Sequence, residues 1–215
     1  MHYCSITEAC NIRDLEVTDV KELALLYSTA FADNPAYSYI FQYEPQSENH
    51  FESLFYLFEK RIQVLLSVGA KFLVAVTNSK IVGAVALCSK DKKPSLWKMA
   101  SVGLFNWPLY WGFSSLFRAL DLDQINEYGA EYNYDAELMM MAVSPHFQGK
   151  GIGNDLLKVM LQQHGPKFSI ILSTQRESNV NFYNKHGFTV VTKSKVKDFD
   201  NWKMHRPPIS SSSTT

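Results

Sequence analysis

The sequence predicts an α/β fold of the α+β type, in which helices flank a single mixed, mostly antiparallel sheet. Two observations lead to this prediction. Short β-rich runs occur along the whole chain of 215 residues, and helical patterns separate only some of them. No internal repeat and no evident linker divides the chain. One domain is therefore expected over residues 1–206, followed by a Ser/Thr-rich, disordered tail over 207–215.

The first part of the chain combines one strand with helices. A short strand leads to a helix that opens at Thr18 or Asp19, because both are favourable N-cap residues ahead of an apolar pattern with helical spacing. Asn34 and Pro35 are expected to break this helix. A longer amphipathic helix is predicted over about 48–68, where apolar residues recur on one face.

Two β-rich runs follow, and they flank Asn78 and Ser79, where the chain can turn tightly into a hairpin. An aromatic-rich insertion then extends from about 94 to 128, between the third and fourth strands, and is predicted to form two helices interrupted at 106–108. Within it, residues 99–117 carry no charge and are long enough to cross a bilayer. Their Asn, Pro, Gly and Ser residues make a membrane span the weaker alternative.

The last part of the chain alternates strands and helices. A strand stopped by Pro145 precedes a helix over 151–163 and a buried strand. A short helix over 179–185 ends at Gly187, a favourable residue after a helix, and a final hairpin closes the fold. The two strand–helix–strand crossovers predict parallel pairs within an otherwise antiparallel sheet.

Composition excludes several classes of function. The chain has 21 basic and 21 acidic residues and no basic block, so no nucleic-acid partner is expected. Cys4, Cys10 and Cys88 form neither a disulfide framework nor a zinc motif, so no metal site is expected. An odd number of cysteines without a disulfide pattern, and an N-terminus without the basic and apolar regions of a signal peptide, suggest a cytoplasmic protein.

Glycines cluster between the fourth predicted strand and the helix that follows it, in the segment QGKGIG. A helix N-terminus offers free N–H groups and partial positive charge, and glycines let a bound anion approach the backbone. A nucleotide P-loop would need glycine where the chain has Ser144. A dinucleotide loop would need a third glycine at Asn154 or Leu156. The loop therefore matches neither ATP-binding nor NAD-binding proteins.

Gln148, Gly151 and Gly153 instead fit the pattern Q/R-x-x-G-x-G/A after a strand that ends in V-x-P. This resembles the acetyl-CoA pyrophosphate loop of the GNAT N-acetyltransferases. The segment NVNFYNKHGFTVV, residues 179–191, independently resembles the N-V-x-F-Y-x-K-x-G-F segment of the same family. Together with the terminal WKMHRPP, these motifs look most like the puromycin N-acetyltransferases and their relatives. The resemblance is strong over about 135–206, looser over 11–89, and absent in the insertion.

The resemblance implies where acetyl-CoA would bind as co-substrate. The fourth strand would splay from its neighbour over 138–143, so that the N–H near Met141 faces the thioester carbonyl. Ala142 and Val143 would pair with the pantetheine amides. The pyrophosphate would lie on the backbone N–H groups of Gln148, Gly149, Lys150, Gly151, Ile152 and Gly153. Lys150 would add charge, unless it is simply a solvated lysine.

Two residues of the second motif receive roles from the same resemblance. Tyr183 stands where the family's tyrosine donates a hydrogen bond to the leaving sulfur, although it could instead be a core tyrosine. Asn179 stands where an asparagine contacts CoA, although it could instead be a helix N-cap.

A general base is useful because an unperturbed lysine-like amine has a pKa of about 10.4 and is mostly protonated at pH 7. Glu137 is the candidate, since it lies on the same strand four residues before Met141. The alternative is an exposed strand glutamate without a catalytic role. Glu131 and Asp135 are weaker candidates.

The resemblance implies that the acceptor pocket is shaped by the early helices and the insertion. Six aromatic residues are candidates to line it for an apolar amine: Trp97, Trp107, Tyr110, Trp111, Tyr132 and Tyr134. The alternative, expected for more than half of them, is packing in the core or between helices. The expected activity is direct acetyl transfer to a primary amine of a small molecule, without a covalent enzyme intermediate. Protein lysine or N-terminal acetylation, a non-catalytic acyl-CoA sensor, and a membrane-attached protein remain alternatives. Exposed aromatic residues could also form a homodimer interface.

Overall fold

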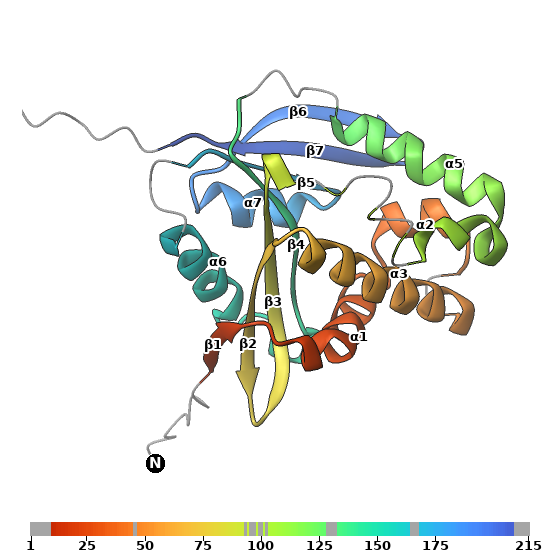
Figure 1. The fold of residues 1–215 in the computed structure, drawn as a ribbon. Coiled ribbons are helices and arrows are strands. Elements are labelled where there is room, and N and C mark those ends of the chain that lie inside the picture. Colours follow the sequence, from red (N-terminus) through yellow and green to blue (C-terminus); the bar gives the residue numbers. More distant parts are fainter. Residues whose placement is uncertain are drawn as a thin grey trace, which may run out of the picture.

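A computed structural model describes residues 10–44, 47–92, 94, 98, 101, 103–127, 133–163 and 168–208 of the chain. The strands of this part are β1 Asn11–Asp14, β2 Lys71–Thr77, β3 Lys80–Ser89, β4 Ala136–Val143, β5 Ile170–Thr174, β6 Thr189–Val196 and β7 Phe199–Arg206. They form one sheet in the order β1-β2-β3-β4-β5-β7-β6 (Figure 1). Adjacent strands run antiparallel except β4 and β5, which run parallel. The predicted mixed, mostly antiparallel sheet is confirmed.

The described α-helices are α1 Val20–Ala30, α2 Pro35–Phe41, α3 Glu48–Ser67, α5 Trp107–Glu127, α6 Ile152–Gln163 and α7 Glu177–Asn184. Short 3-10 helices lie at Val17–Asp19, Lys90–Lys92, Leu104–Asn106 and Pro145–Phe147. The first four α-helices pack into a core on one face of the sheet, and α6 and α7 pack into a second core on the other face (Figure 1). The sheet therefore separates two halves that can supply different groups to one site.

The segment after Asn34 is a helix, which the sequence interpretation missed. α1 ends at Ala30, before the predicted break at Asn34, and the Asn34 Oδ1 atom accepts a hydrogen bond from the N–H of Ala36 at 2.9 Å. Pro35 is the first residue of α2, where its missing N–H costs nothing. The two residues that predict the end of one helix therefore cap the next. The predicted long helix over 48–68 is confirmed by α3.

The β2–β3 hairpin turns at the predicted dipeptide. Asn78 and Ser79 both have positive φ, at 50° and 61°. Two successive residues with positive φ are typical of the tight turns that match the twist of a hairpin. Asparagine adopts this conformation more readily than other non-glycine residues, which is why the dipeptide was informative.

The insertion is helical, but its break lies elsewhere than predicted. Asn106 ends a 3-10 helix and α5 begins at Trp107, with Pro108 in the first turn, where proline is tolerated. The non-helical residue is Gly112, with φ 76° and ψ 162°. Several residues before 103 lie outside the described part, including Trp97. Within that part, no helix is long and apolar enough to cross a membrane.

A bulge in β4 changes which side chains face each core. In the pairing with β3, Leu138 and Met140 lie opposite consecutive residues, so Met139 is an extra residue. An extra residue reverses the alternation of side chains along a strand. Leu138 accordingly packs with α6 and α7, whereas Met140 packs with α1 and α3. Met141 then returns to the side of α6 and α7.

β4 and β5 separate after a short contact. They pair only where Ala136 lies opposite Ile170 and Glu137 opposite Ile171. Beyond this point β5 continues along β7, and residues 138–143 have no described partner on the β5 side. The predicted splay is confirmed. It leaves backbone N–H and C=O groups of β4 facing a gap, where an extended ligand can pair with them.

Candidate active site

A cleft of about 410 Å³ opens where β4 and β5 diverge. Most of the residues singled out from the sequence line it: Met141, Ala142, Val143, Gln148, Gly149, Gly151, Ile152, Gly153, Asn179 and Tyr183. Ala30 and Phe31 at the end of α1 line it as well. Because α1 and α6 lie on opposite faces of the sheet, the cleft reaches residues of both halves of the molecule.

The glycine loop needs glycine for its backbone conformation. Gly149 and Gly151 have φ of +77° and +87°, a region that other L-residues rarely adopt. No heavy atom lies within 4 Å of where a Cβ atom would stand on either residue. At Gly153, by contrast, a Cβ atom would lie 3.5 Å from Met141 Cε and 3.7 Å from Phe182 Cζ. Conformation therefore limits the first two positions, and the width of the cleft limits the third.

The N-terminus of α6 faces this loop with unpaired donors. The Asp155 N–H donates to the Gly151 carbonyl at 3.1 Å, as the first bond of the helix. The N–H groups of residues 152–154 therefore have no acceptor within the helix. Such groups, together with the positive end of the helix dipole, form a site for an anion. The loop has the donor set that a pyrophosphate needs.

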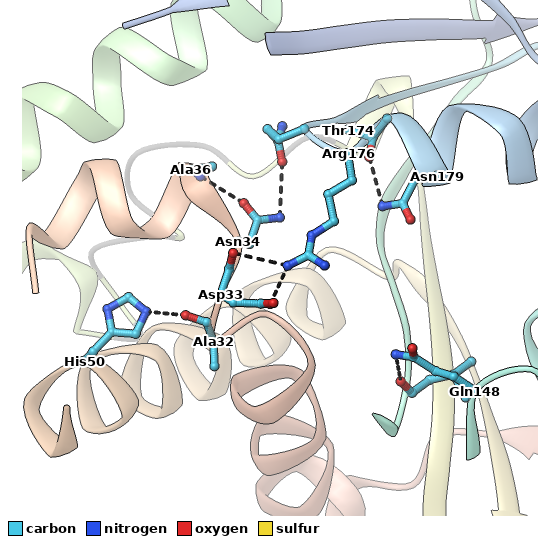
Figure 2. Close-up of polar contacts among 11 residues, drawn as sticks. Ala32, Asp33, Asn34, Ala36, His50, Gln148, Thr174, Arg176 and Asn179 are labelled. Atoms are coloured by element: carbon cyan, nitrogen blue, oxygen red, sulfur yellow. Dashed lines mark hydrogen bonds and ion pairs between the residues drawn. The ribbon is translucent and has the colours of Figure 1, made fainter. Parts of the chain in front are cut away.

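Gln148 anchors the loop to β4. Its side-chain Nε2 donates to the Val143 carbonyl at 3.1 Å (Figure 2). Its backbone N–H donates to the Pro145 carbonyl at 3.4 Å. Both bonds fix the path of the chain as it leaves the strand. Lys150 does not line the cleft, and its Nζ atom lies 4.7 Å from the centre of the Phe147 ring, which does.

Tyr183 lies deep in the cleft. Its side chain is buried, and it packs on Phe182 and Phe188 with ring centres 5.2 Å and 5.7 Å away. Burial raises the pKa of the Tyr183 phenol. The hydroxyl therefore stays protonated and available as a hydrogen-bond donor at neutral pH. It belongs to both the core and the cleft, so the two interpretations of this residue are compatible.

Asn179 is not a helix N-cap. α7 begins at Glu177, two residues earlier than predicted, and Arg176 is its N-cap. The Asn179 Nδ2 atom donates to Thr174 Oγ1 at 3.0 Å, across from the end of β5 (Figure 2). This bond holds the Asn179 amide at the wall of the cleft, and the amide oxygen can accept a hydrogen bond from another donor.

Glu137 stands apart from the lining of the cleft. It is half-buried in the part of β4 that pairs with both neighbours. Four residues of strand separate it from Met141, which is about 13 Å at 3.3 Å per residue. Because the bulge lies between them, Glu137 points to the face of α1 and α3, opposite to Met141. Asp135, the weaker candidate, accepts a hydrogen bond from the Ser169 N–H at 2.7 Å. Glu131 lies outside the described residues.

Two loops meet over the cleft through contacts that sequence patterns did not indicate. Arg176 pairs with the Asp33 carboxylate and donates to the Asp33 carbonyl at 3.1 Å (Figure 2). Asn34 Nδ2 donates to Gln175 Oε1 at 3.3 Å. Gln175 Nε2 donates to Asn201 Oδ1 at 2.7 Å. The partners of the Arg176 pair are 143 positions apart, so no spacing within a motif could reveal them. Arg176 and Asn34 both line the cleft.

The six candidate aromatic residues do not form one pocket. Trp107 is buried against Phe41, with ring centres 5.9 Å apart. Tyr134 is buried elsewhere, with Lys90 Nζ 4.6 Å from its ring centre. Tyr110 and Trp111 line a second pocket, away from the cleft. Trp97 and Tyr132 lie outside the described residues. In the described part, no three His, Cys, Asp or Glu side chains are placed to hold a metal ion.

One known protein family matches the part of the chain that contains these features. The model of the acetyltransferase (GNAT) domain matches residues 114–190. This range contains β4, the glycine loop, α6, β5 and α7. Over these residues the chain is similar to the GNAT acetyltransferase domain. Acetyl-CoA is the co-substrate of the GNAT family, and the donor set at the start of α6 suits its pyrophosphate.

Solved structures share the fold over nearly the whole chain. A structure described as histone acetyltransferase HPA2 and related acetyltransferase, from Corynebacterium glutamicum, has a TM-score of 0.63 and 20% identity, covering 93% of this chain and 97% of that one. PaiA N-acetyltransferase from Thermoplasma acidophilum, in complex with coenzyme A, has a TM-score of 0.51 and 18% identity, over 93% and 99%. An agmatine N-acetyltransferase mutant has a TM-score of 0.57 and 14% identity, over 91% and 98%. These likenesses establish the GNAT fold. No curated protein sequence matches the chain significantly.

Proposed function

We propose that the GNAT domain of this chain transfers acetyl from acetyl-CoA directly to a primary amine of a small molecule. One observation carries the proposal. The cleft joins a helix N-terminus suited to a pyrophosphate, an open strand edge and a buried tyrosine in one continuous space. An acetyl thioester supplies an activated acyl group, and the residues around it need only bind, orient and move protons.

The open edge of β4 would hold the thioester arm. In the proposed arrangement the N–H of Met141 donates to the thioester carbonyl and stabilises the negative charge that develops on its oxygen. Ala142 and Val143 pair with the amides that precede the thioester. The bulge at Met139 supports this assignment, because it turns Met141 toward the same face as the glycine loop.

Tyr183 would donate a hydrogen bond to the leaving sulfur. An ordinary phenol has a pKa near 10 and a thiol near 8.5, so full proton transfer is uphill by about 2 kcal/mol. Burial raises the pKa of Tyr183 above that ordinary value, which makes full transfer harder still. We therefore assign Tyr183 as a hydrogen-bond donor to the sulfur. The thiolate takes up its proton late in the reaction, either from Tyr183 or from solvent.

Glu137 would accept the proton of the attacking amine. An amine with a pKa of about 10.4 is neutral in only about one molecule in a few thousand at pH 7, so a base raises the reactive fraction. Glu137 and Met141 are about 13 Å apart along the strand, so a chain of water molecules must relay the proton. Since Glu137 points toward α1 and α3, we place the amine entrance on that face, opposite to the glycine loop.

Two experiments test the cofactor and the chemistry separately. About 1 mM CoA should raise the melting temperature by mass action, and replacing Gly151 with a bulky residue should remove the shift. Tyr183→Phe should then lose turnover but keep the shift, because the ring still fills its place. No shift with CoA in the unaltered protein would refute the proposed binding site.

The acceptor decides between the remaining alternatives. A panel of primary amines, with CoA release as the readout, should identify a small-molecule substrate. Release only with peptides would support protein lysine or N-terminal acetylation instead. Binding of CoA without release on any amine would support a non-catalytic acyl-CoA sensor. The panel should include puromycin, since the sequence motifs look most like those of puromycin N-acetyltransferases.

We further propose a cytoplasmic protein that forms a homodimer. Neither Cys10 nor Cys88 forms a disulfide in the described part of the chain, which suits a reducing compartment. Phe113, Phe117 and Leu120 expose 67%, 66% and 52% of their surfaces along α5 and have the spacing of one helix face. Light scattering after gel filtration would give the mass, and a monomer at all concentrations would exclude the dimer.

A further inference from the structure

A second pocket, of about 300 Å³, lies between α3 and the first turn of α5. It is lined by Tyr43, Asn49, Glu52, Ser53, Tyr56, Tyr110 and Trp111. None of these residues lines the cleft. The four α3 residues are spaced at three, one and three positions, which places them on one face of the helix. The pocket is therefore built by α3, the insertion and the segment after α2.

Three aromatic rings of different orientation border this pocket. The ring centre of Tyr56 lies 5.0 Å from that of Tyr110 and 5.5 Å from that of Trp111. Their planes meet at 41° and 74°, so the rings do not stack into a closed pile. The faces of such rings carry negative partial charge and attract cations. Lys60 Nζ already lies 5.3 Å from the Tyr56 ring centre, so this ring accepts a cation in the folded protein.

The wall of the pocket is held in place before any ligand arrives. Trp111 Nε1 donates to Ser53 Oγ at 2.8 Å, and Ser53 Oγ donates to the Asn49 carbonyl at 2.7 Å. Behind the pocket, Trp111 packs on Trp107 and Phe41, with ring centres 4.8 Å and 5.1 Å away. A fixed aromatic wall loses little conformational entropy on binding.

The polar groups of the wall indicate which kind of cation fits. Glu52 is the charged residue of the lining, and its charge is negative. The Trp111 N–H and the Ser53 hydroxyl already bond to each other, so they offer little to a ligand N–H. A cation whose charge is spread over methyl groups needs no such acceptor and gains from contact with the rings.

We propose that this pocket binds a small organic cation that carries a methylated ammonium group, with Tyr56, Tyr110 and Trp111 around the ammonium and Glu52 as its counter-ion. The site is separate from the cleft, so the proposal does not depend on the proposed acetyl transfer. Choline is a suitable probe, because its ammonium has no N–H and cannot accept an acetyl group on nitrogen.

The test is calorimetric titration with choline and with 3,3-dimethylbutan-1-ol, its neutral isostere, at constant ionic strength. We expect saturable choline binding with a Kd on the order of 1 mM, at least about fivefold tighter than the isostere. Tyr110 is 59% exposed, so Tyr110→Ala should fold normally and weaken choline at least about threefold. Glu52→Gln should weaken it by about as much.

Glu48→Gln is the matched control, since Glu48 is an exposed carboxylate of the same helix that does not line the pocket. This variant should bind choline as the unaltered protein does. All three variants should have the melting temperature of the unaltered protein. Equal affinity for choline and the isostere would overturn the proposal. So would unchanged choline affinity in Tyr110→Ala and Glu52→Gln, or no binding at about 50 mM choline.

Discussion

The glycine loop gives the sharpest prediction, because Gly151 and Gly153 should respond oppositely to the same methyl group. Gly151 has φ +87° and open space where a Cβ atom would stand, so Gly151→Ala adds conformational strain without a clash. A left-handed conformation costs an alanine roughly 1–2 kcal/mol. At about 2–4 °C per kcal/mol for a chain of this size, the melting temperature should fall by roughly 2–8 °C.

Gly153→Ala should be tolerated. Its φ is not positive, and a Cβ atom would lie 3.5–3.7 Å from Met141, Val143 and Phe182, which is ordinary van der Waals contact. Alanine is preferred over glycine in a helix by up to about 1 kcal/mol, so the variant should melt at the same temperature or up to about 4 °C higher. Gly153→Leu would extend past these contacts into the cleft and should block it.

The assay is a thermal melt of each variant with and without CoA. At a CoA concentration of about 100 Kd, binding stabilises by about 2.7 kcal/mol, which is a shift of roughly 5–11 °C. The unaltered protein and Gly153→Ala should show this shift, whereas Gly151→Ala and Gly153→Leu should lose most of it. Gly149→Ala, with φ +77° and equally open space, should lower the melting temperature by a similar amount. The reasoning is refuted if Gly151→Ala melts like the unaltered protein and keeps its shift.

Three further predictions concern stability and catalysis. Burial lowers the pKa of His50, His186 and His205 below the ordinary value near 6.5, so the unfolded chain binds more protons in that range. The melting temperature should fall as the pH drops below about 6.5. His50→Gln should flatten this pH dependence, and an unchanged dependence in that variant would contradict the prediction. At Gly83 a Cβ atom would come within 3.0 Å of α6. Gly83→Val should therefore lower the free energy of unfolding by about 1–3 kcal/mol, measured with denaturant. An unchanged unfolding midpoint would count against this close packing. Glu137→Gln should reduce turnover most at low pH, where the amine is protonated, while CoA still shifts the melt; equal turnover at every pH would exclude Glu137 as the base.

Local sequence signals predicted most of the elements, because those signals act within a few residues. Asn78-Ser79 predicted the hairpin through backbone conformations that both residues do adopt. Asn34-Pro35 predicted a break that α1 makes earlier, at Ala30, and the same residue types also start helices, so α2 was missed. In the insertion, Pro108 was taken as an interruption although proline is also favourable in a first turn. Such ambiguities are local, and only packing resolves them.

Features that depend on distant contacts could not be predicted in this way. The insertion of β7 between β5 and β6 follows from which edges are left to pair, which no single segment encodes. The Arg176–Asp33 pair joins two loops that meet only after the sheet has formed. The aromatic residues of the insertion were candidates either to line a pocket or to pack in the core, and their helix divides them between core and surface. Composition alone carries no information about that division.

In the proposed function, β4 serves two substrates through two differently paired parts. At its start it is paired on both sides, which fixes Glu137 within the sheet. At its end one edge is open, so Met141 and its neighbours can pair with an extended ligand. The bulge at Met139 lies between these parts and reverses the faces, so the proposed base and the proposed oxyanion donor point to opposite sides. A strand without the bulge would place both on one face, where the amine and the thioester arm would compete for the same space.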